Sequence, residues 1–566
     1  MTPWSALVDQ GQDLGSRAEN IIAAIVVQEF GSAADEDLDA TVFELGGNSL
    51  HVTRIVNRLR AETGWTIPLS TVFAHSSPRA MAQWLAESGQ LAAAPPGIAE
   101  NGGCGTPEPG DEVQLSQAQL GIWLLQSADE RRLDLNLPIR IDLDEKIDAL
   151  ALESALSRLA DMHPALRTVF RETADGPRQS VIDELRVPLA TLDLRAASDP
   201  EAAAERVLAD DTRRLLDLAS SPARATLLLL PPDRSVLQLV VHHLVADGVS
   251  AGVLLRDLSA CYRYELDPTR PVPAVPRARY LDHVRAELSQ LTGVRREQLE
   301  QHWCAVLADP LPPLPFGFQS HPASGSKLIE SMPFRLSSDL VAALGERAHT
   351  YGVSRHVLLL GAFATVLTEF SGADEVVICV PWSGREQAKF ADVVGMFVNN
   401  LPVRLGTRGA DKFAEIVERT QKASLAAYEH SALPYTLLAQ GRIGLAGQLR
   451  RPIFDTAFQL TDFLPPAGQI SDLAMGLYGQ PESGGLAFRL DHDTRRVSRS
   501  DAADVRSGFC AALALIAAGE STLVAVAAAA RGEGELIEKP SQAPGVARLA
   551  SLLGVAVSDE PRSPLA

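Results

Sequence analysis

The spacing of apolar residues predicts a small helical unit near the start of the chain. Residues 18–30 place apolar side chains at the three- and four-residue intervals of one helical face. The same spacing recurs at residues 50–59 and 81–85, and Pro78 after two serines is typical of a helix start. Short amphipathic helices this close together predict an all-α four-helix bundle over residues 16–88.

The rest of the chain alternates between helical and strand patterns. Helical spacing appears at residues 149–159, 249–261 and 357–370, and short apolar runs of strand length appear at residues 225–230, 236–241 and 376–380. The first two runs flank a short turn-like segment and predict a buried hairpin. Interleaved helices and strands indicate an α/β architecture. We expect two lobes, at residues 113–285 and 286–528.

Two segments show neither period. Residues 89–112 are dominated by Gly, Pro and Ala, which predicts a linker between the small unit and the large one. Residues 529–566 are richer in Gly, Pro and charge, and we expect a poorly ordered tail there, with residues 546–557 as one candidate short helix.

Composition narrows the classes of function. The 566 residues are 46% hydrophobic and 22% charged, an ordinary globular balance, and the net charge of −20 argues against a nucleic-acid-binding protein. The five cysteines form no CxxC pair or Cys/His cluster, which argues against a metal site or a disulfide framework. Apolar stretches are too short for a spanning helix and no signal sequence is evident, so we expect a soluble, cytoplasmic protein without a membrane partner.

Ser49 is the first candidate for chemistry. Gly46 and Gly47 permit a tight turn, and Ser49 then stands where the helix over residues 50–59 is expected to begin. Free N–H groups and the positive end of the helix dipole suit a phosphate at that position. The same pattern also fits a serine that only caps the helix.

The second candidate is the segment VHHLVADGVS at residues 241–250. His242 and His243 end an apolar strand, where successive side chains point to opposite faces, so one ring could enter the core while the other faces a cavity. An imidazole titrates near neutral pH and can accept a proton. Asp247 could fix the local geometry or pair with a cation, and Gly248 permits a turn with an accessible N–H. Two core histidines without a catalytic role would give the same pattern.

The segment around Ser49 resembles the attachment motif of the peptidyl carrier proteins of nonribosomal peptide synthetases. The family pattern is Phe, then Leu-Gly-Gly-(Asp/His)-Ser-Leu, and the chain reads FELGGNSL at residues 43–50. Asn48 replaces the usual Asp or His. The resemblance implies that Ser49 carries a covalent 4′-phosphopantetheine arm as a phosphodiester.

The larger unit resembles the condensation domains of the same synthetases. Seven stretches follow the order of that family's motifs, with HHxxxDG at residues 241–250 as the most specific; the other six are at residues 115–124, 163–170, 280–284, 394–404, 429–435 and 451–454. The resemblance implies a two-lobed chloramphenicol-acetyltransferase-like fold with a tunnel between the lobes.

That resemblance also implies an activity and roles for residues. Such domains are acyltransferase-type enzymes that join a carrier-bound donor thioester to an acceptor amine through an amide bond. His243 would be the active-site residue, as a general base or as a group that positions the amine. His242 and Asp247 would support it, and the Gly248 N–H would be a donor to the developing oxyanion.

The chain departs from the family pattern in its second motif. An Arg–His–Glu sequence is expected where residues 162–164 read Met, His and Pro, so one proposed partner of Asp247 is missing. Arg167 and Arg385 are the remaining candidates for that ion pair. Asn399, the first of two adjacent asparagines, is either a tunnel-facing amide or part of a strand-end turn.

The expected partners follow from the same resemblance. They are a phosphopantetheinyl transferase, an adenylation domain acting upstream or in trans, and an acceptor carrier protein or free amine. Alternatives within the fold are an ester-forming or macrocyclising release domain, or a catalytically silent module that recruits other enzymes. The intact His243 argues against the silent module.

Overall fold

The computed structural model describes most of the larger unit and part of the small one. The described residues are 14–30, 38–42, 75–88, 112–128, 135–144, 146–308, 311–316, 329–439, 452–461, 473–482, 485–519 and 522–530, with single positions between 45 and 72. Ser49, the predicted linker up to residue 111 and residues 531–566 of the predicted tail lie outside them, whereas residues 529 and 530 of that tail are the end of a helix.

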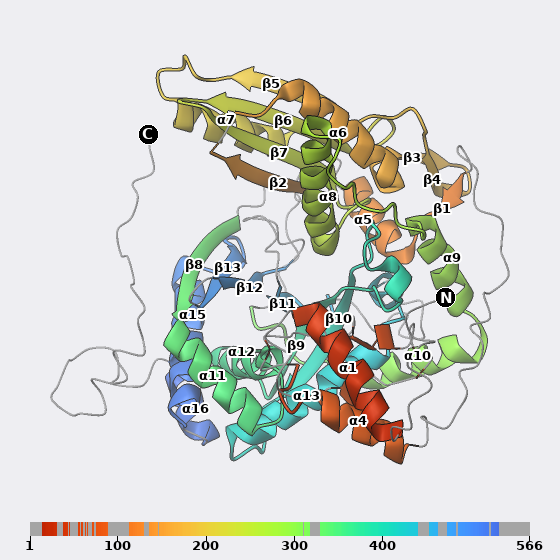
Figure 1. Ribbon diagram of the computed structural model, residues 1–566. Helices are drawn as coiled ribbons and strands as arrows, with labels where there is room; N and C mark the ends of the chain where they lie inside the picture. The colour runs from red at the N-terminus through yellow and green to blue at the C-terminus, as the bar shows by residue number, and fades with distance from the viewer. Residues whose placement is uncertain are drawn as a thin grey trace.

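The start of the chain is helical, as its apolar spacing predicts. Helices α1 (Leu14–Phe30) and α4 (Pro78–Glu87) pack together, and the described positions between residues 52 and 59 are also helical. Ser77 caps α4, its hydroxyl accepting the Ala80 N–H at 3.3 Å, with Pro78 at the first helical position. The buried side chains of this region belong to the same apolar cluster as those of the lower half of the molecule, against which Figure 1 draws α1 and α4.

The upper half in Figure 1 is built on a four-stranded sheet with the order β2-β7-β6-β5. Its strands and helices are β2 (Asn136–Leu143), α6 (Ala149–Met162), β5 (Leu189–Asp193), α7 (Pro200–Arg213), β6 (Ala223–Leu230), β7 (Arg234–His242) and α8 (Gly248–Leu266). Strands β6 and β7 form the predicted antiparallel hairpin. Leu227 and Leu237 contact the cluster of α6 and α8, whereas Leu228 and Val236 contact α7. Burial on both faces explains why these strands read as continuous apolar runs.

A three-stranded sheet, with the order β1-β4-β3, lies beside this half. Its elements and the short helices near it are β1 (Val113–Gln114), α5 (Gln117–Ala128), η4 (Pro164–Arg167), β3 (Thr168–Thr173) and β4 (Gly176–Val181). Helix α9 (Tyr280–Gln290) then leads into the lower half, so the boundary expected after residue 285 falls inside a helix.

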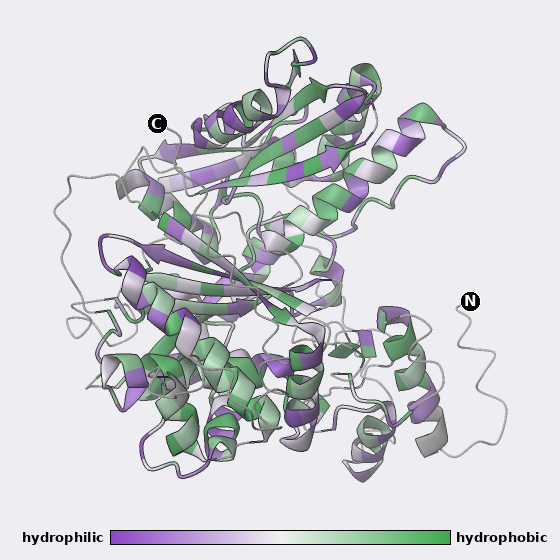
Figure 2. Ribbon diagram, turned by 90° about the vertical axis from the view of Figure 1, so that its left-hand side faces the viewer, coloured by the Kyte–Doolittle hydropathy of each residue, from purple (hydrophilic) through white to green (hydrophobic). Residues whose placement is uncertain are grey.

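The lower half holds a six-stranded sheet with the order β10-β9-β11-β12-β13-β8. Its strands are β8 (Ile329–Ser337), β9 (Glu375–Trp382), β10 (Asn399–Gly406), β11 (Thr456–Leu460), β12 (Met475–Glu482) and β13 (Gly485–Asp493). Its helices are α10 (Gly293–Val306), α11 (Ser338–Thr350), α12 (Arg355–Ser371), η5 (Ala388–Phe390), α13 (Phe413–Glu429), α14 (Tyr435–Ala439), α15 (Arg499–Ala518) and α16 (Leu523–Ala530). In Figure 2 the two sheets lie one above the other, and green, apolar residues are frequent in the helices beneath the lower sheet.

The two sheet-bearing halves confirm the expected two-lobed α/β architecture. Among the described helices, no single one is long and apolar enough to cross a membrane; α11 and α12 meet that criterion only as a pair, bent by 98°.

Candidate active site where the two halves meet

The histidine pair stands at the end of β7. His242 is the last residue of the strand and pairs with Asn136 of β2, and the His243 N–H donates to the carbonyl oxygen of Leu135 at 2.9 Å. The His242 side chain is 3% exposed, whereas the His243 side chain is partly exposed. One ring is therefore in the core and the other reaches a less enclosed space, as alternation along the strand predicts.

The contacts of His242 fix its tautomer. Its Nδ1 accepts the Leu244 N–H at 3.2 Å, so its proton lies on Nε2, which faces the Gln126 side-chain oxygen at 3.3 Å. Burial, with a smaller contribution from neighbouring His243, lowers the pKa of His242 to about 3. His242 therefore stays neutral near pH 7 and does not act as a proton acceptor.

His243 has the opposite tautomer. Its Nδ1 lies 3.1 Å from the Ala246 carbonyl oxygen, which can only accept, so Nδ1 carries the proton. The lone pair is then on Nε2. A carbonyl contact that fixes the ring in this way prepares Nε2 to accept a proton from another group.

Asp247 stabilises the turn that follows the histidines. It is 1% exposed, caps α8, and accepts the Ser250 N–H at 2.8 Å and the Ser250 hydroxyl at 2.9 Å. Arg385 from the lower half binds both carboxylate oxygens, at 2.7 and 2.9 Å. Burial alone would raise the pKa of Asp247, but the Arg385 charge and these hydrogen bonds outweigh burial and lower it. The carboxylate is therefore ionised. Gly248 begins α8 directly after it, where helix N–H groups have no intrahelical acceptor.

The loop that carries Arg385 is adapted to reach this turn. Gly384 has φ of +65°, and a Cβ there would lie 2.0 Å from the carbonyl oxygen of Phe397, so only glycine fits. The Arg385 guanidinium lies 4.2 Å from the centre of the Phe397 ring, and the Phe397 N–H donates to Asp247 at 3.1 Å. These contacts join the histidine turn of the upper half to the lower half.

Further residues that the sequence analysis did not single out complete this junction. The Ser250 hydroxyl oxygen lies 2.9 Å from the Gly395 carbonyl oxygen, which competes with Asp247 for its single proton, and it accepts the Gly395 N–H at 3.1 Å. The Tyr280 hydroxyl donates to the Met396 carbonyl oxygen at 2.6 Å. Ser250 follows the DG pair of the histidine motif by two residues, and Tyr280 begins the matching stretch at residues 280–284, so the sequence indicates their positions but not their contacts.

Arg167 is not the partner of Asp247. It ends the 3₁₀ helix η4, and its guanidinium binds the Ala160 carbonyl oxygen at 2.8 Å and Asp183 at 2.8 Å. The histidine of the same motif, His163, is also buried and lies 2.9 Å from Asp257. In this chain the second motif therefore supports the core of the upper half and leaves the Asp247 ion pair to Arg385.

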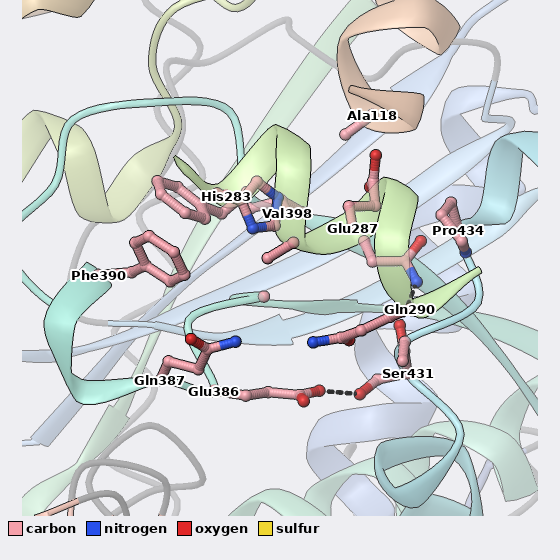
Figure 3. Close-up of a pocket in the computed structure, with 15 residues that line it drawn as sticks. Ala118, His283, Glu287, Gln290, Glu386, Gln387, Phe390, Val398, Ser431 and Pro434 are labelled. Carbon is pink, nitrogen blue, oxygen red and sulfur yellow. Dashed lines mark hydrogen bonds between the residues drawn. The ribbon is translucent and has the colours of Figure 1, made fainter. Parts of the chain in front are cut away.

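Asn399 lies at the start of β10 and holds a neighbouring segment in place. Its amide donates to the carbonyl oxygens of Ser431 and Leu433, at 2.8 and 2.9 Å, and its oxygen accepts the Tyr435 N–H at 2.8 Å. Asn399 also lines a pocket between α9 and the loop after β9 (Figure 3). The amide is thus a structural support at a pocket wall.

Comparison with known proteins identifies the family. A model of the condensation domain matches residues 110–473, which is more than half of the chain. The chain belongs to the condensation-domain family of nonribosomal peptide synthetases. A model of the phosphopantetheine attachment site matches residues 20–85, so a carrier region precedes the condensation domain.

The similar proteins are much longer than this chain. Over 71% of its own length, this chain is 31% identical to the probable non-canonical nonribosomal peptide synthetase CymA of Salinispora arenicola. Over 81% of its own length, it is 28% identical to malpinin synthetase of Mortierella alpina. The matched segments span 5% and 6% of those two relatives.

Solved structures agree on the fold. The first condensation domain of the calcium-dependent antibiotic synthetase matches with a TM-score of 0.63 at 22% identity, covering 74% of this chain and 98% of that one. The X-domain from teicoplanin biosynthesis matches with a TM-score of 0.64 at 24% identity, covering 73% of this chain and 97% of that one. The condensation fold positions the histidine turn and the Arg385 loop at the junction described above.

Proposed function

We propose that this chain forms an amide bond between a donor carried on its own carrier region and an acceptor amine. The carrier occupies residues 16–88, a linker residues 89–112, and the condensation domain residues 113–530, with its two lobes meeting at α9. The observation that supports the proposal is the orientation of His243: its Nδ1–H donates to the Ala246 carbonyl oxygen, which places the lone pair of the ring on Nε2.

The carrier region supplies the tether. A serine hydroxyl is the group that a phosphodiester needs, and Ser49 lies within the matched attachment-site residues 20–85, so the residues present fit 4′-phosphopantetheine. When bound, that group would supply a terminal thiol that holds the donor as a thioester, and the reach to bring it between the lobes. The linker raises the effective concentration of the donor at the condensation domain. A phosphopantetheinyl transferase would install the arm, and an adenylation domain acting upstream or in trans would activate the donor.

The residues at the junction would then orient the reaction. The acceptor nitrogen forms a bond to the thioester carbonyl carbon, the carbon–sulfur bond breaks, and the nitrogen's proton passes through His243 Nε2 to the departing thiolate. An α-amine has a pKa near 8, so an appreciable fraction is already neutral near pH 7. Holding the two reactants in the reacting geometry lowers the activation free energy by roughly 7–11 kcal/mol, so most of the rate gain does not require base catalysis. The Gly248 N–H, at the start of α8, is the donor we assign to the oxyanion.

The ion pair between Asp247 and Arg385 acts on this geometry without touching the substrate. It fixes the turn that carries the Ala246 carbonyl, and that carbonyl orients the His243 ring. His242 supports the same turn through Leu244. We assign Asp247, Arg385 and His242 as positioning residues and His243 as the catalytic residue.

The second candidate function is recruitment of another enzyme. It is considered because the X-domain from teicoplanin biosynthesis, solved in complex with OxyB, matches this chain with a TM-score of 0.63. A condensation fold that recruits another enzyme would not need His243. Ester formation and macrocyclising release use the same residues with a hydroxyl or an internal nucleophile in place of the external amine.

The test is His243→Ala in the full chain, loaded with an acyl donor and supplied with a carrier-bound or free amine. We expect amide formation, followed by mass spectrometry of the protein-bound and released products, to fall by about a hundredfold or more, the range of a lost general base. His349→Ala, a change at an exposed histidine on α11, is the matched control and should react like the parent. Unchanged turnover in His243→Ala would remove His243 from the mechanism.

A further inference from the structure

Two carboxyl groups line the pocket between the two halves, and Arg385 and Lys389 lie against two of its aromatic rings. Glu287 and Gln290 extend from α9 on one side, and Glu386, Gln387 and Ser431 lie on the other (Figure 3). No lysine or arginine is among the described residues that line it. Burial lowers the pKa of the lining imidazole, His283, to about 4, with the Arg385 charge adding to this effect, so His283 is neutral near pH 7.

The two carboxyl groups are held in place by different halves of the molecule. Glu287 accepts the Gln117 N–H at the start of α5, at 2.8 Å. Glu386 accepts the Ser431 hydroxyl at 2.5 Å. Each of these bonds engages one oxygen of a group that has two, and neither supplies a compensating positive charge.

Glu287 in particular lacks a counter-charge among the described residues of the pocket. Burial raises the pKa of this carboxyl to about 7, although the Gln117 N–H opposes the shift. A cation placed beside Glu287 would lower its pKa again and release the proton that the carboxyl holds near pH 7. The rings of Phe390 and Phe397 also line the pocket, but each already has a cation of the protein against it. The Arg385 guanidinium lies 4.2 Å from the centre of the Phe397 ring, and the Lys389 ammonium lies 4.9 Å from the centre of the Phe390 ring, so the carboxyl groups are the part of the wall that would attract a further cation.

The pocket adjoins the candidate active site. Phe397 lines it, while its backbone N–H donates to Asp247. Gly384, also a lining residue, directly precedes Arg385, whose charge is matched by Asp247. A group bound in this pocket would therefore lie across one aromatic ring from the turn that orients His243.

We propose that this pocket binds a primary ammonium group on a side chain of one of the two substrates, with Glu386 and Glu287 as its counter-charges. The proposal rests on the function proposed above and adds the class of substrate. A side-chain ammonium is distinct from the amine that reacts, because His243 is not among the residues that line the pocket.

The first test measures binding alone. Butylammonium, which is charged at pH 7, is titrated into the full chain by calorimetry, with butanol as the neutral compound of matched length. We expect butylammonium to bind with proton release and butanol not to bind. Glu386→Gln and Glu287→Gln should each weaken butylammonium about tenfold or more, the usual effect of losing a hydrogen bond to a charged group. Glu297→Gln, at an exposed carboxylate on α10, is the control and should bind like the parent.

The second test measures the reaction. Lysyl and norleucyl thioesters, whose side chains differ by the terminal ammonium, are compared as donors and as acceptors. The parent should prefer lysine by about tenfold or more in one of these roles, and in Glu386→Gln the ratio of the lysine rate to the norleucine rate should fall to about one. If Glu386→Gln lowered the rates with the lysyl and norleucyl substrates equally, the pocket would bind a group that both share, such as the thioester arm, and the proposal would be overturned.

The two tests separate the two proposals. Amide formation that needs His243 but shows no lysine preference overturns the ammonium site and leaves the proposed function standing. If no amide forms with any pair, the proposed function fails, and the butylammonium titration still decides the pocket. Binding of butylammonium that is unchanged in both carboxamide variants contradicts the site directly.

Discussion

Replacing Arg385 with methionine tests whether the ion pair between the two halves holds the histidine turn. The substitution keeps an unbranched side chain but removes both bonds to Asp247, at 2.7 and 2.9 Å. Asp247 is 1% exposed, so water cannot replace them. Breaking one partner of a buried ion pair costs about 3–5 kcal/mol because a charge is left buried without compensation. We expect a loss of that size in the free energy of unfolding.

The matched control is Arg335→Met. Arg335 binds Glu482 at 3.0 Å, but its side chain is 76% exposed. An exposed pair of this kind contributes about 0–1 kcal/mol. Urea unfolding of the full-length variants, followed by circular dichroism, should therefore separate the two substitutions clearly. A loss in Arg385→Met no larger than that in Arg335→Met would refute the reasoning.

The pH dependence supplies a second check, and its sign follows from the shift at Asp247. The folded parent lowers the pKa of Asp247, so the ion pair stabilises fully above the unfolded pKa of about 3.9 and is lost as the pH falls through the folded pKa. In Arg385→Met the positive charge that opposes the effect of burial is absent, so burial raises the pKa of Asp247. The deficit of the variant should then shrink as the pH falls toward the raised folded pKa of Asp247, because protonated Asp247 is less costly to bury. Adding Asp247→Asn should shrink it at every pH.

Local patterns were enough to predict the elements that carry the site. The hairpin of β6 and β7 follows from two apolar runs around a short turn, and its pairing agrees with that expectation. Helix α8 begins at Gly248, directly after the capping Asp247, as the DG pair at a strand-to-helix turn indicates. These features depend on residues within a few positions of one another, so a short stretch of sequence is enough to predict them.

Contacts between distant segments could not be predicted in the same way. Arg385 and Asp247 are separated by 138 positions, and the sequence could only reduce the choice to two arginines. Arg167 was as plausible as Arg385 by motif, but η4 directs it toward Asp183. The pocket between the lobes is harder still to predict, because its carboxyl groups come from α9 and from the loop after β9, and neither lies in one of the seven motif stretches.

Two further substitutions test the carrier and the junction. Ser49→Ala should take up no phosphopantetheine from coenzyme A with a promiscuous transferase, by intact-protein mass spectrometry, whereas Ser88→Ala should load like the parent; loading of Ser49→Ala would move the attachment site elsewhere. Gly395→Ala should destabilise the chain by about 1–3 kcal/mol or more, because a Cβ there would lie 2.0 Å from the Tyr280 ring, which is itself fixed by its bond to the Met396 carbonyl oxygen. The matched control is Gly345→Ala in α11, where nothing lies within 4 Å of the added Cβ and alanine should be neutral or stabilising. Urea unfolding that ranks the two alanines equally would mean that Tyr280 can yield, and that the loop from Gly395 to Phe397 is not clamped between the two halves as the hydrogen bonds indicate.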